Sequence, residues 1–297
     1  MITLENKMLK VCLNPDFGCK IHSFLHKETG FELAAQSEKE VQIRGSEKKA
    51  VFGDYAYGFD DAFPNIDAES LSLHNKTFNY PDHGMVWDRK FRVINATSDS
   101  ALCSFKDDDL KLTYTKSFSL KGETLTSEIS IEYEESSPFP CIYTFHGLIK
   151  YEDDMEIVLP KGSDELINVL KHPRFGDVGN ILETEDVSKL PKYGSGDMLK
   201  YYVCGRVKEG KCGVKYTKSG MEYELSYDSN CLPYLGVWIT AGGLDGANNM
   251  ALEPSDGFYD SVSKAIDNKA VKVLKPNEKR LIRLDIRLRR IPEDKDV

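Results

Sequence analysis

The chain has 297 residues, 40% of them hydrophobic, which is enough to bury a sizeable core. A formal net charge of -9 argues against a nucleic-acid partner, because such proteins neutralise phosphates with clustered Lys and Arg. The sequence contains no run of about 18 apolar residues, so it predicts no membrane-spanning helix. Residues 1–7 lack the basic and apolar pattern of a secretion signal, so we expect a cytoplasmic protein with no membrane partner.

The first clear structural signal is a hairpin. Apolar and polar residues alternate over residues 112–120 and again over 124–134, which predicts two strands with one buried face each. The short Lys121-Gly-Glu-Thr124 link between them is typical of a hairpin turn.

Helical signals are sparse. Residues 163–170 (Ser-Asp-Glu-Leu-Ile-Asn-Val-Leu) predict a short helix that Ser163 caps. Residues 172–200 are rich in Pro, Gly and acidic residues and show no sustained period, which predicts a long loop. Such a loop is either functional or a solvated linker.

Two further strands follow. Residues 221–227 and 281–290 alternate as the hairpin does, so the basic residues near the C-terminus form the solvated face of a strand. Many strands and few helices predict an all-β fold, a sandwich or a barrel, which we expect to be a single domain over residues 1–297.

The seven cysteines are scattered and include no Cys-x-x-Cys pair, so we expect reduced thiols and no metal site. The chain also lacks a glycine-rich phosphate loop and a His-Glu-x-x-His motif.

Three polar residues interrupt apolar or turn-rich segments: His83, His146 and Glu253. Histidine titrates near neutrality, and burial can raise the pKa of a carboxylate into a useful range, so these residue types suit acid and base catalysis. Each also has a structural interpretation, as a hydrogen-bonded buried histidine or as a strand-end carboxylate.

Aromatic and paired acidic residues give weaker signals. Trp87 and Trp238 are the only tryptophans in the sequence. Each of them has two interpretations, as an aromatic platform for a sugar ring or as a core residue. Asp60 and Asp61 resemble the paired acids of a glycosidase, but adjacent residues of an extended chain point to opposite faces.

Several motifs in their order resemble the aldose 1-epimerase (galactose mutarotase-like) family from end to end. They are Asp16 to Leu25 with Glu28 to Leu33, Phe59-Asp-Asp-Ala-Phe-Pro64, Asp82-His-Gly-Met-Val-Trp87, Thr144-Phe-His146, Pro233 to Trp238, Ala251-Leu-Glu-Pro254 and Val273 to Glu278. The resemblance implies a large antiparallel β-sandwich with a sugar cleft on one sheet.

The same resemblance implies roles for single residues. Glu253 is expected to take the proton from the anomeric hydroxyl, His146 to protonate the ring oxygen, and His83 to bind the sugar. The expected partner is a small-molecule sugar, and the protein is expected to act as a monomer or homodimer without a cofactor.

Two departures from the family pattern bear on the substrate. The arginine that some members carry close after the His-Gly pair is missing unless Arg89 replaces it. The sugar-binding aspartate expected between His146 and Glu253 has four candidates: Asp177, Asp186, Asp197 and Asp228.

The sequence is compatible with three functions. They are an enzyme that interconverts sugar anomers, a sugar-binding protein without turnover, and an epimerase of phosphorylated hexoses. The last function requires basic residues near the cleft, for which Lys171, Arg174 and Arg89 are scattered candidates.

Overall fold

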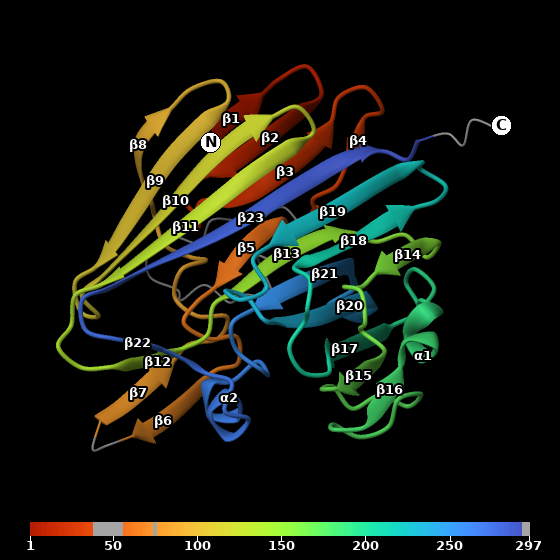
Figure 1. The fold of residues 1–297 in the computed structure, drawn as a ribbon. Helices are drawn as coiled ribbons and strands as arrows, with labels where there is room; N and C mark the ends of the chain where they lie inside the picture. Colours follow the sequence, from red (N-terminus) through yellow and green to blue (C-terminus); the bar gives the residue numbers. More distant parts are fainter. Residues whose placement is uncertain (38–55, 74–75, 293–297) are drawn as a thin grey trace.

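Two antiparallel β-sheets lie face to face in the computed structural model, which describes residues 1–37, 56–73 and 76–292 (Figure 1). In these residues the larger sheet has eleven strands. Their order is β1 (Ile2–Glu5), β2 (Leu9–Asn14), β3 (Lys20–His26), β5 (Phe59–Ala62), β13 (Thr144–Lys150), β21 (Ala247–Ser255), β20 (Tyr234–Leu244), β17 (Asp197–Val203), β15 (Glu165–Asn168) and β16 (Ile181–Glu183), with β4 (Phe31–Glu32) beside β3.

The smaller sheet lies in front of the larger one in Figure 1 and has eight strands in the described residues. Their order is β14 (Met155–Val158), β18 (Lys211–Tyr216), β19 (Met221–Tyr227), β23 (Glu278–Arg290), β11 (Thr124–Tyr133), β10 (Leu112–Lys121), β9 (Ser100–Asp107) and β8 (Arg92–Ala96). Two small ribbons complete the strands: β12 (Phe139–Cys141) with β22 (Lys272–Leu274), and β6 (Glu69–Leu73) with β7 (Lys76–Tyr80).

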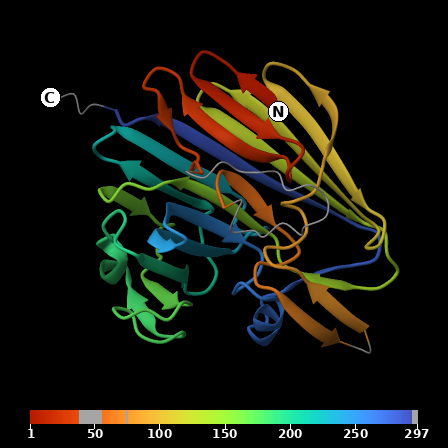
Figure 2. The ribbon, with the colours of Figure 1, turned by 180° about the vertical axis from the view of Figure 1, so that it is seen from behind.

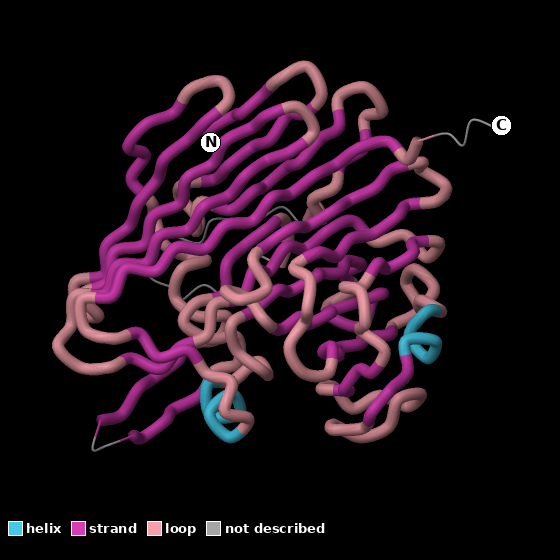
Figure 3. The backbone as a smooth tube through the Cα atoms, in the orientation of Figure 1, coloured by secondary structure: helices cyan, strands magenta, loops and turns pink. Residues whose placement is uncertain are grey.

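Helices are short and lie at the periphery (Figure 3). They are α1 (Thr184–Ser188) and α2 (Val262–Asp267). Ser261 caps α2 by accepting a hydrogen bond from the Lys264 amide.

The core fills the space between the two sheets because strand residues alternate between faces. Along β10 and β11 every second residue is buried, as in Leu125, Ile129 and Ile131. The predicted hairpin is confirmed, with Leu120 opposite Leu125 and Leu112 opposite Tyr133. The predicted strands at residues 221–227 and 281–290 are confirmed as β19 and the main part of β23.

Two sequence predictions are wrong. Residues 165–168 of the predicted helix form strand β15, because its backbone pairs with β16 on one side and β17 on the other and buries Leu166. Residues 172–200 are not one long loop, since they contain β16, α1 and the start of β17. In both cases pairing with distant strands outweighs local preference.

The core also contains a buried ion pair that joins the two sheets. Lys116 on β10 faces inward, and its Nζ lies 2.7 Å from Asp61 Oδ2 on β5. Both side chains are nearly inaccessible, and Tyr143 donates its hydroxyl to Asp61 as well. Asp60 pairs instead with Lys20, so the two neighbouring aspartates have separate partners, as expected for opposite faces of one strand.

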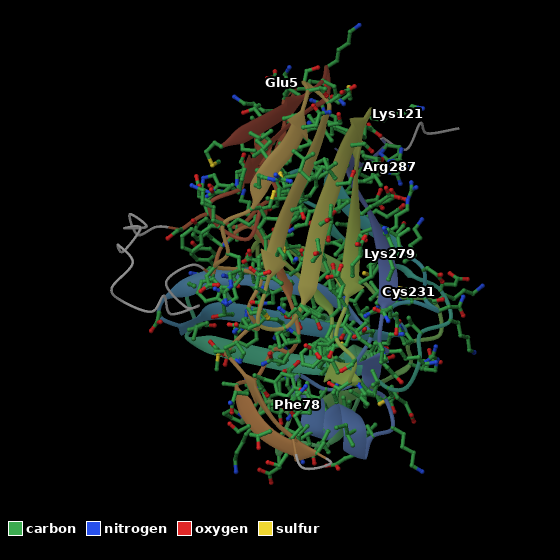
Figure 4. All side chains as sticks on the ribbon, turned by 90° about the vertical axis from the view of Figure 1, so that its left-hand side faces the viewer. Glu5, Phe78, Lys121, Cys231, Lys279 and Arg287 are labelled. Atoms are coloured by element: carbon green, nitrogen blue, oxygen red, sulfur yellow. The ribbon has the colours of Figure 1, made fainter. Side chains whose placement is uncertain are left out.

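Removal of one partner of this ion pair is expected to destabilise the protein strongly. Lys116→Met leaves the Asp61 carboxylate buried beside a neutral side chain, which costs about 3–5 kcal/mol of unfolding free energy. Urea unfolding at pH 7 measures the loss. Lys121→Met at the exposed end of the same strand (Figure 4) is the matched control, and an equal loss in both variants would contradict the prediction.

Candidate functional site

The site begins with a histidine and a glutamate on neighbouring strands. Gly147 of β13 pairs with Leu252 of β21, which places His146 beside Glu253. His146 Nε2 lies 3.6 Å from Glu253 Oε1. Phe145 and Leu252 belong to the core between the sheets, so alternation directs His146 and Glu253 to the opposite face of the larger sheet. Figure 2 views the molecule from the side of that sheet.

A lysine on β17 joins this pair. Lys200 Nζ lies 3.0 Å from Glu253 Oε2 and 3.1 Å from Asp260 Oδ1. Tyr202, two residues further along β17 on the same face, donates its hydroxyl to Asp260 at 2.5 Å. A continuous polar network therefore runs from His146 through Glu253, Lys200 and Asp260 to Tyr202.

Gly236 makes room for this network. It lies on β20 between Glu253 and Tyr202 in the strand register. A Cβ at this position would lie 3.0 Å from Glu253 Oε2 and 3.0 Å from the Tyr202 ring. The absence of a side chain lets the carboxylate extend over the strand toward Lys200.

Burial sets the protonation preferences of these groups. Complete burial raises the pKa of Glu253, and the neighbouring Lys200 ammonium opposes that rise. Burial by itself lowers the pKa of Lys200, but Asp260 and Glu253 outweigh it, so this pKa lies above its usual value. The pKa of His146 lies well below its usual value, mainly because the ring is buried and secondly because His83 lies beside it. The lysine is thus the group that favours an ionised Glu253.

His83 approaches from a tight turn rather than from a strand. Its backbone is left-handed (φ 54°), and its amide donates to the Ile66 carbonyl at 2.6 Å. Gly84 follows with φ 72°, and a Cβ there would lie 2.2 Å from the Phe63 carbonyl oxygen, so this position requires glycine. The His83 ring meets that of His146 edge to face, with centroids 5.4 Å apart. The two histidines and the glutamate therefore converge.

A second ion pair borders the histidine on the other side. Asp60 on β5 is the strand partner of His146, and Lys20 Nζ lies 3.0 Å from Asp60 Oδ2. The same ammonium lies 4.1 Å from the centroid of the Tyr57 ring. His146 therefore lies in a row of charged and polar side chains that crosses the sheet from Lys20 to Tyr202.

The other predicted site residues lie at different distances from this row. Trp238 on β20 is the strand partner of Lys200 and packs on the buried Leu148 and Ala251. Trp87 is 4% exposed and packs with Tyr57 in a separate apolar cluster. Arg89 donates to the Met85 carbonyl and pairs with Asp88, and no interaction with His146 or Glu253 is found in the part of the chain that the structure describes.

Sequence reasoning missed Lys200, Asp260, Tyr202 and Gly236. The four candidate aspartates have other partners: Asp177 pairs with Lys171, Asp186 caps α1, Asp197 contacts His172, and Asp228 lies in a turn. The aspartate that does join the network, Asp260, follows Glu253 in the chain. The one sequence signal for Lys200 was a lysine inside the strand-like run Met198-Leu-Lys-Tyr-Tyr-Val203.

Among residues 1–37, 56–73 and 76–292, no cluster of three or more His, Cys, Asp or Glu side chains has the geometry to hold a metal ion. In the same residues no helix has the length and apolar character needed to cross a membrane.

Solved structures share this architecture over nearly their whole length. A protein from Synechocystis sp. PCC 6803 superposes with a TM-score of 0.75 at 14% identity, covering 96% of this chain and 94% of its own. A galactose mutarotase-like protein from Lactobacillus casei ATCC 334 gives 0.72 at 19% identity, covering 97% and 100%. This chain has a galactose mutarotase-like fold.

A GalM/aldose epimerase homologue from C. elegans shares the fold, with a TM-score of 0.69 at 14% identity and coverage of 98% and 99%. No protein-family model and no curated protein matches the sequence. The predicted all-β, galactose mutarotase-like sandwich is confirmed, and at these identities the likeness concerns the fold alone.

The electrostatic role of Lys200 predicts a pH-dependent loss of stability. In Lys200→Met the buried Glu253 carboxylate loses its closest cation, which costs about 3–5 kcal/mol at neutral pH. Removing the lysine raises the pKa of Glu253 further, so the folded variant holds a proton that the unfolded chain releases. Its stability therefore falls as pH rises between the unfolded and the folded pKa of this carboxyl group.

Urea unfolding of wild type and Lys200→Met from pH 4 to 8 measures this effect. The difference in unfolding free energy is expected to widen with rising pH. Lys192→Met, on an exposed segment, is the control and is expected to follow the wild type. A difference for Lys200→Met that is constant over this pH range would contradict the assignment.

Proposed function

We propose that the protein is an aldose 1-epimerase, which interconverts the α and β anomers of a neutral free hexose or a related sugar. The convergence of Glu253, His146 and His83 on one face of the larger sheet carries this proposal. A carboxylate and an imidazole on adjacent strands are suited to act on two oxygens bonded to the same carbon. The names of proteins with the same fold support the same reaction class.

The reaction needs one proton removed and one proton delivered. Glu253 takes the proton from the anomeric hydroxyl, His146 gives a proton to the ring oxygen, and the bond between the anomeric carbon and the ring oxygen breaks. Rotation of the resulting aldehyde and the reverse transfers close the ring as the other anomer. The net reaction is an isomerisation, with no change of oxidation state and no leaving group, so the proposed mechanism requires no cofactor.

The residues around Glu253 and His146 influence the protonation states of both side chains. Glu253 and His146 together hold one proton in the productive state, with the carboxylate ionised and the imidazole protonated. Lys200 favours the ionised carboxylate. Burial, His83 and Lys200 lower the pKa of His146, so its neutral form prevails and the imidazolium, once formed, is a strong acid. His83 lies close enough to His146 to polarise the same ring oxygen.

A neutral sugar fits the site better than a phosphorylated one. The cations nearest the pair, Lys200 and Lys20, are already engaged with carboxylates. Of the three scattered basic candidates, Lys171 pairs with Asp177, and the Arg174 guanidinium donates to the Asp186 and Lys189 carbonyls. A phosphate group would therefore have to break existing pairs.

A sugar-binding protein without turnover is the second candidate. The observation that favours it is that Glu253 is fully buried and already held by Lys200. Calorimetry detects binding and polarimetry detects anomerisation, so saturable binding of a sugar without faster relaxation of its optical rotation would favour this second function.

Loss of the base tests the enzymatic proposal. Glu253→Gln keeps the shape of the side chain but cannot accept the anomeric proton, so the rate of anomerisation is expected to fall by about 10²-fold or more. The relaxation of optical rotation of fresh α-glucose and α-galactose measures this rate. Glu128→Gln, on the outer face of the smaller sheet, is the matched control. Equal rates for wild type and Glu253→Gln on every sugar tested would refute the role of Glu253.

The pH dependence of the rate tests the part played by Lys200. Without the ammonium group, Glu253 protonates at a higher pH, so the acidic limb of the pH profile of kcat/KM is expected to move upward in Lys200→Met. Lys200→Arg keeps the charge and is expected to restore most of the original profile. A lower rate with an unchanged acidic limb would mean that Lys200 acts only on structure.

A further inference from the structure

A cavity of about 610 Å³ opens on the larger sheet beyond the candidate active site. Its walls come from the β3–β4 region, from Tyr57 before β5, and from the β20–β21 hairpin, including Ala247 and Asn249. This volume lies within the range of about 300–1,000 Å³ that is usual for small-molecule pockets. Neither His146 nor Glu253 lines it, so the proposed reaction leaves it without a role.

The cavity lies on the same face of the sheet as the His146–Glu253 pair. Glu253, Ala251, Asn249 and Ala247 alternate along β21 and therefore face the same side. Asn249 precedes Glu253 by four residues, which is about 14 Å along a strand. A ligand that reaches both places must be longer than one pyranose ring.

An apolar floor connects the two places. Ala251, Leu148 and Ala35 are buried together on this face, and Trp238 packs against them. Trp238 also pairs in register with Lys200, which holds Glu253. The aromatic ring thus lies between the catalytic pair and the cavity, where the apolar face of a sugar ring packs well.

Asn249 is the polar group that points to a ligand. The residue is only 4% exposed and lines the cavity. Its Oδ1 accepts the Trp238 indole N–H at 3.2 Å, and because an indole nitrogen only donates, this bond fixes the orientation of the amide. In the described residues no hydrogen bond uses its Nδ2, so this donor remains available to a ligand in the cavity.

Aromatic and polar groups also form the opposite wall. Tyr57 lines the cavity and lies under the Lys20 ammonium, which pairs with Asp60 beside His146. The cavity therefore connects with the active-site row on two sides, through Trp238 and through Tyr57. Aromatic rings with amide donors are the surroundings that a neutral carbohydrate prefers.

We propose that this cavity is a second saccharide subsite, which binds the non-reducing unit of a disaccharide while its reducing ring lies at His146 and Glu253. Trp238 is the platform between the two rings, and Asn249 donates to a hydroxyl of the distal ring. This inference rests on the proposed function and narrows its substrate class to saccharides longer than a single hexose.

The test compares disaccharides with their own reducing unit. Maltose, cellobiose and lactose all end in glucose, so binding of each is measured by calorimetry against glucose. Wild type is expected to bind at least one disaccharide at least about tenfold more tightly than glucose. Ala247→Trp fills the cavity, and Asn249→Ala removes the donor; both are expected to lower the disaccharide-to-glucose affinity ratio toward one.

Val93→Trp, on the exposed strand β8, is the control and is expected to keep the ratio of the wild type. The subsite is refuted if no disaccharide binds more tightly than glucose, or if Ala247→Trp leaves the ratio unchanged. Polarimetry separates this failure from failure of the proposed function. An enzyme without the subsite still anomerises glucose through Glu253, whereas a protein with the subsite but no enzymatic function keeps the affinity ratio without anomerisation.

Discussion

The buried charge of Glu253 is the constraint on which the rest of the site depends. A carboxylate with no exposed surface is stable in its ionised form only when a cation lies beside it, and Lys200 provides that cation at 3.0 Å. Lys200 in turn needs Asp260, and Asp260 accepts a hydrogen bond from Tyr202. Two ion pairs and one hydrogen bond link these side chains in sequence, and the network extends from β21 across β20 to β17.

The larger sheet has two faces with different tasks. One face packs on the smaller sheet and carries Phe145 and Leu252, while the other carries His146 and Glu253 one residue away. The rigidity needed to hold His146 and Glu253 a few ångströms apart therefore comes from the packed core directly beneath them. The Lys116–Asp61 ion pair also joins the two sheets beneath the site. Asp61 is the neighbour of Asp60 on β5, and Asp60 faces the site and pairs with Lys20.

Charge also favours one class of ligand at the open face. The cations near the His146–Glu253 pair have carboxylate partners, so the face offers hydrogen-bonding groups and aromatic rings rather than free positive charge. Trp238 and Asn249 continue this character away from the pair. The neutral saccharide that we propose as ligand would satisfy such a surface without the cost of breaking buried ion pairs.

The sequence by itself determined the all-β class and the hairpin of β10 and β11, because alternation is a local property of the chain. Short motifs also predicted the three site residues His83, His146 and Glu253, which the structure brings together. The sequence predicted a helix over residues 163–170, since nothing local reveals that Leu166 pairs with β16 and β17. Only the tertiary structure brought Lys200 and Asp260 to Glu253 and opened a cavity beyond Trp238. The physical reason is that strand register, set by pairing between segments far apart in the sequence, decides which side chains share a row on one face of a sheet.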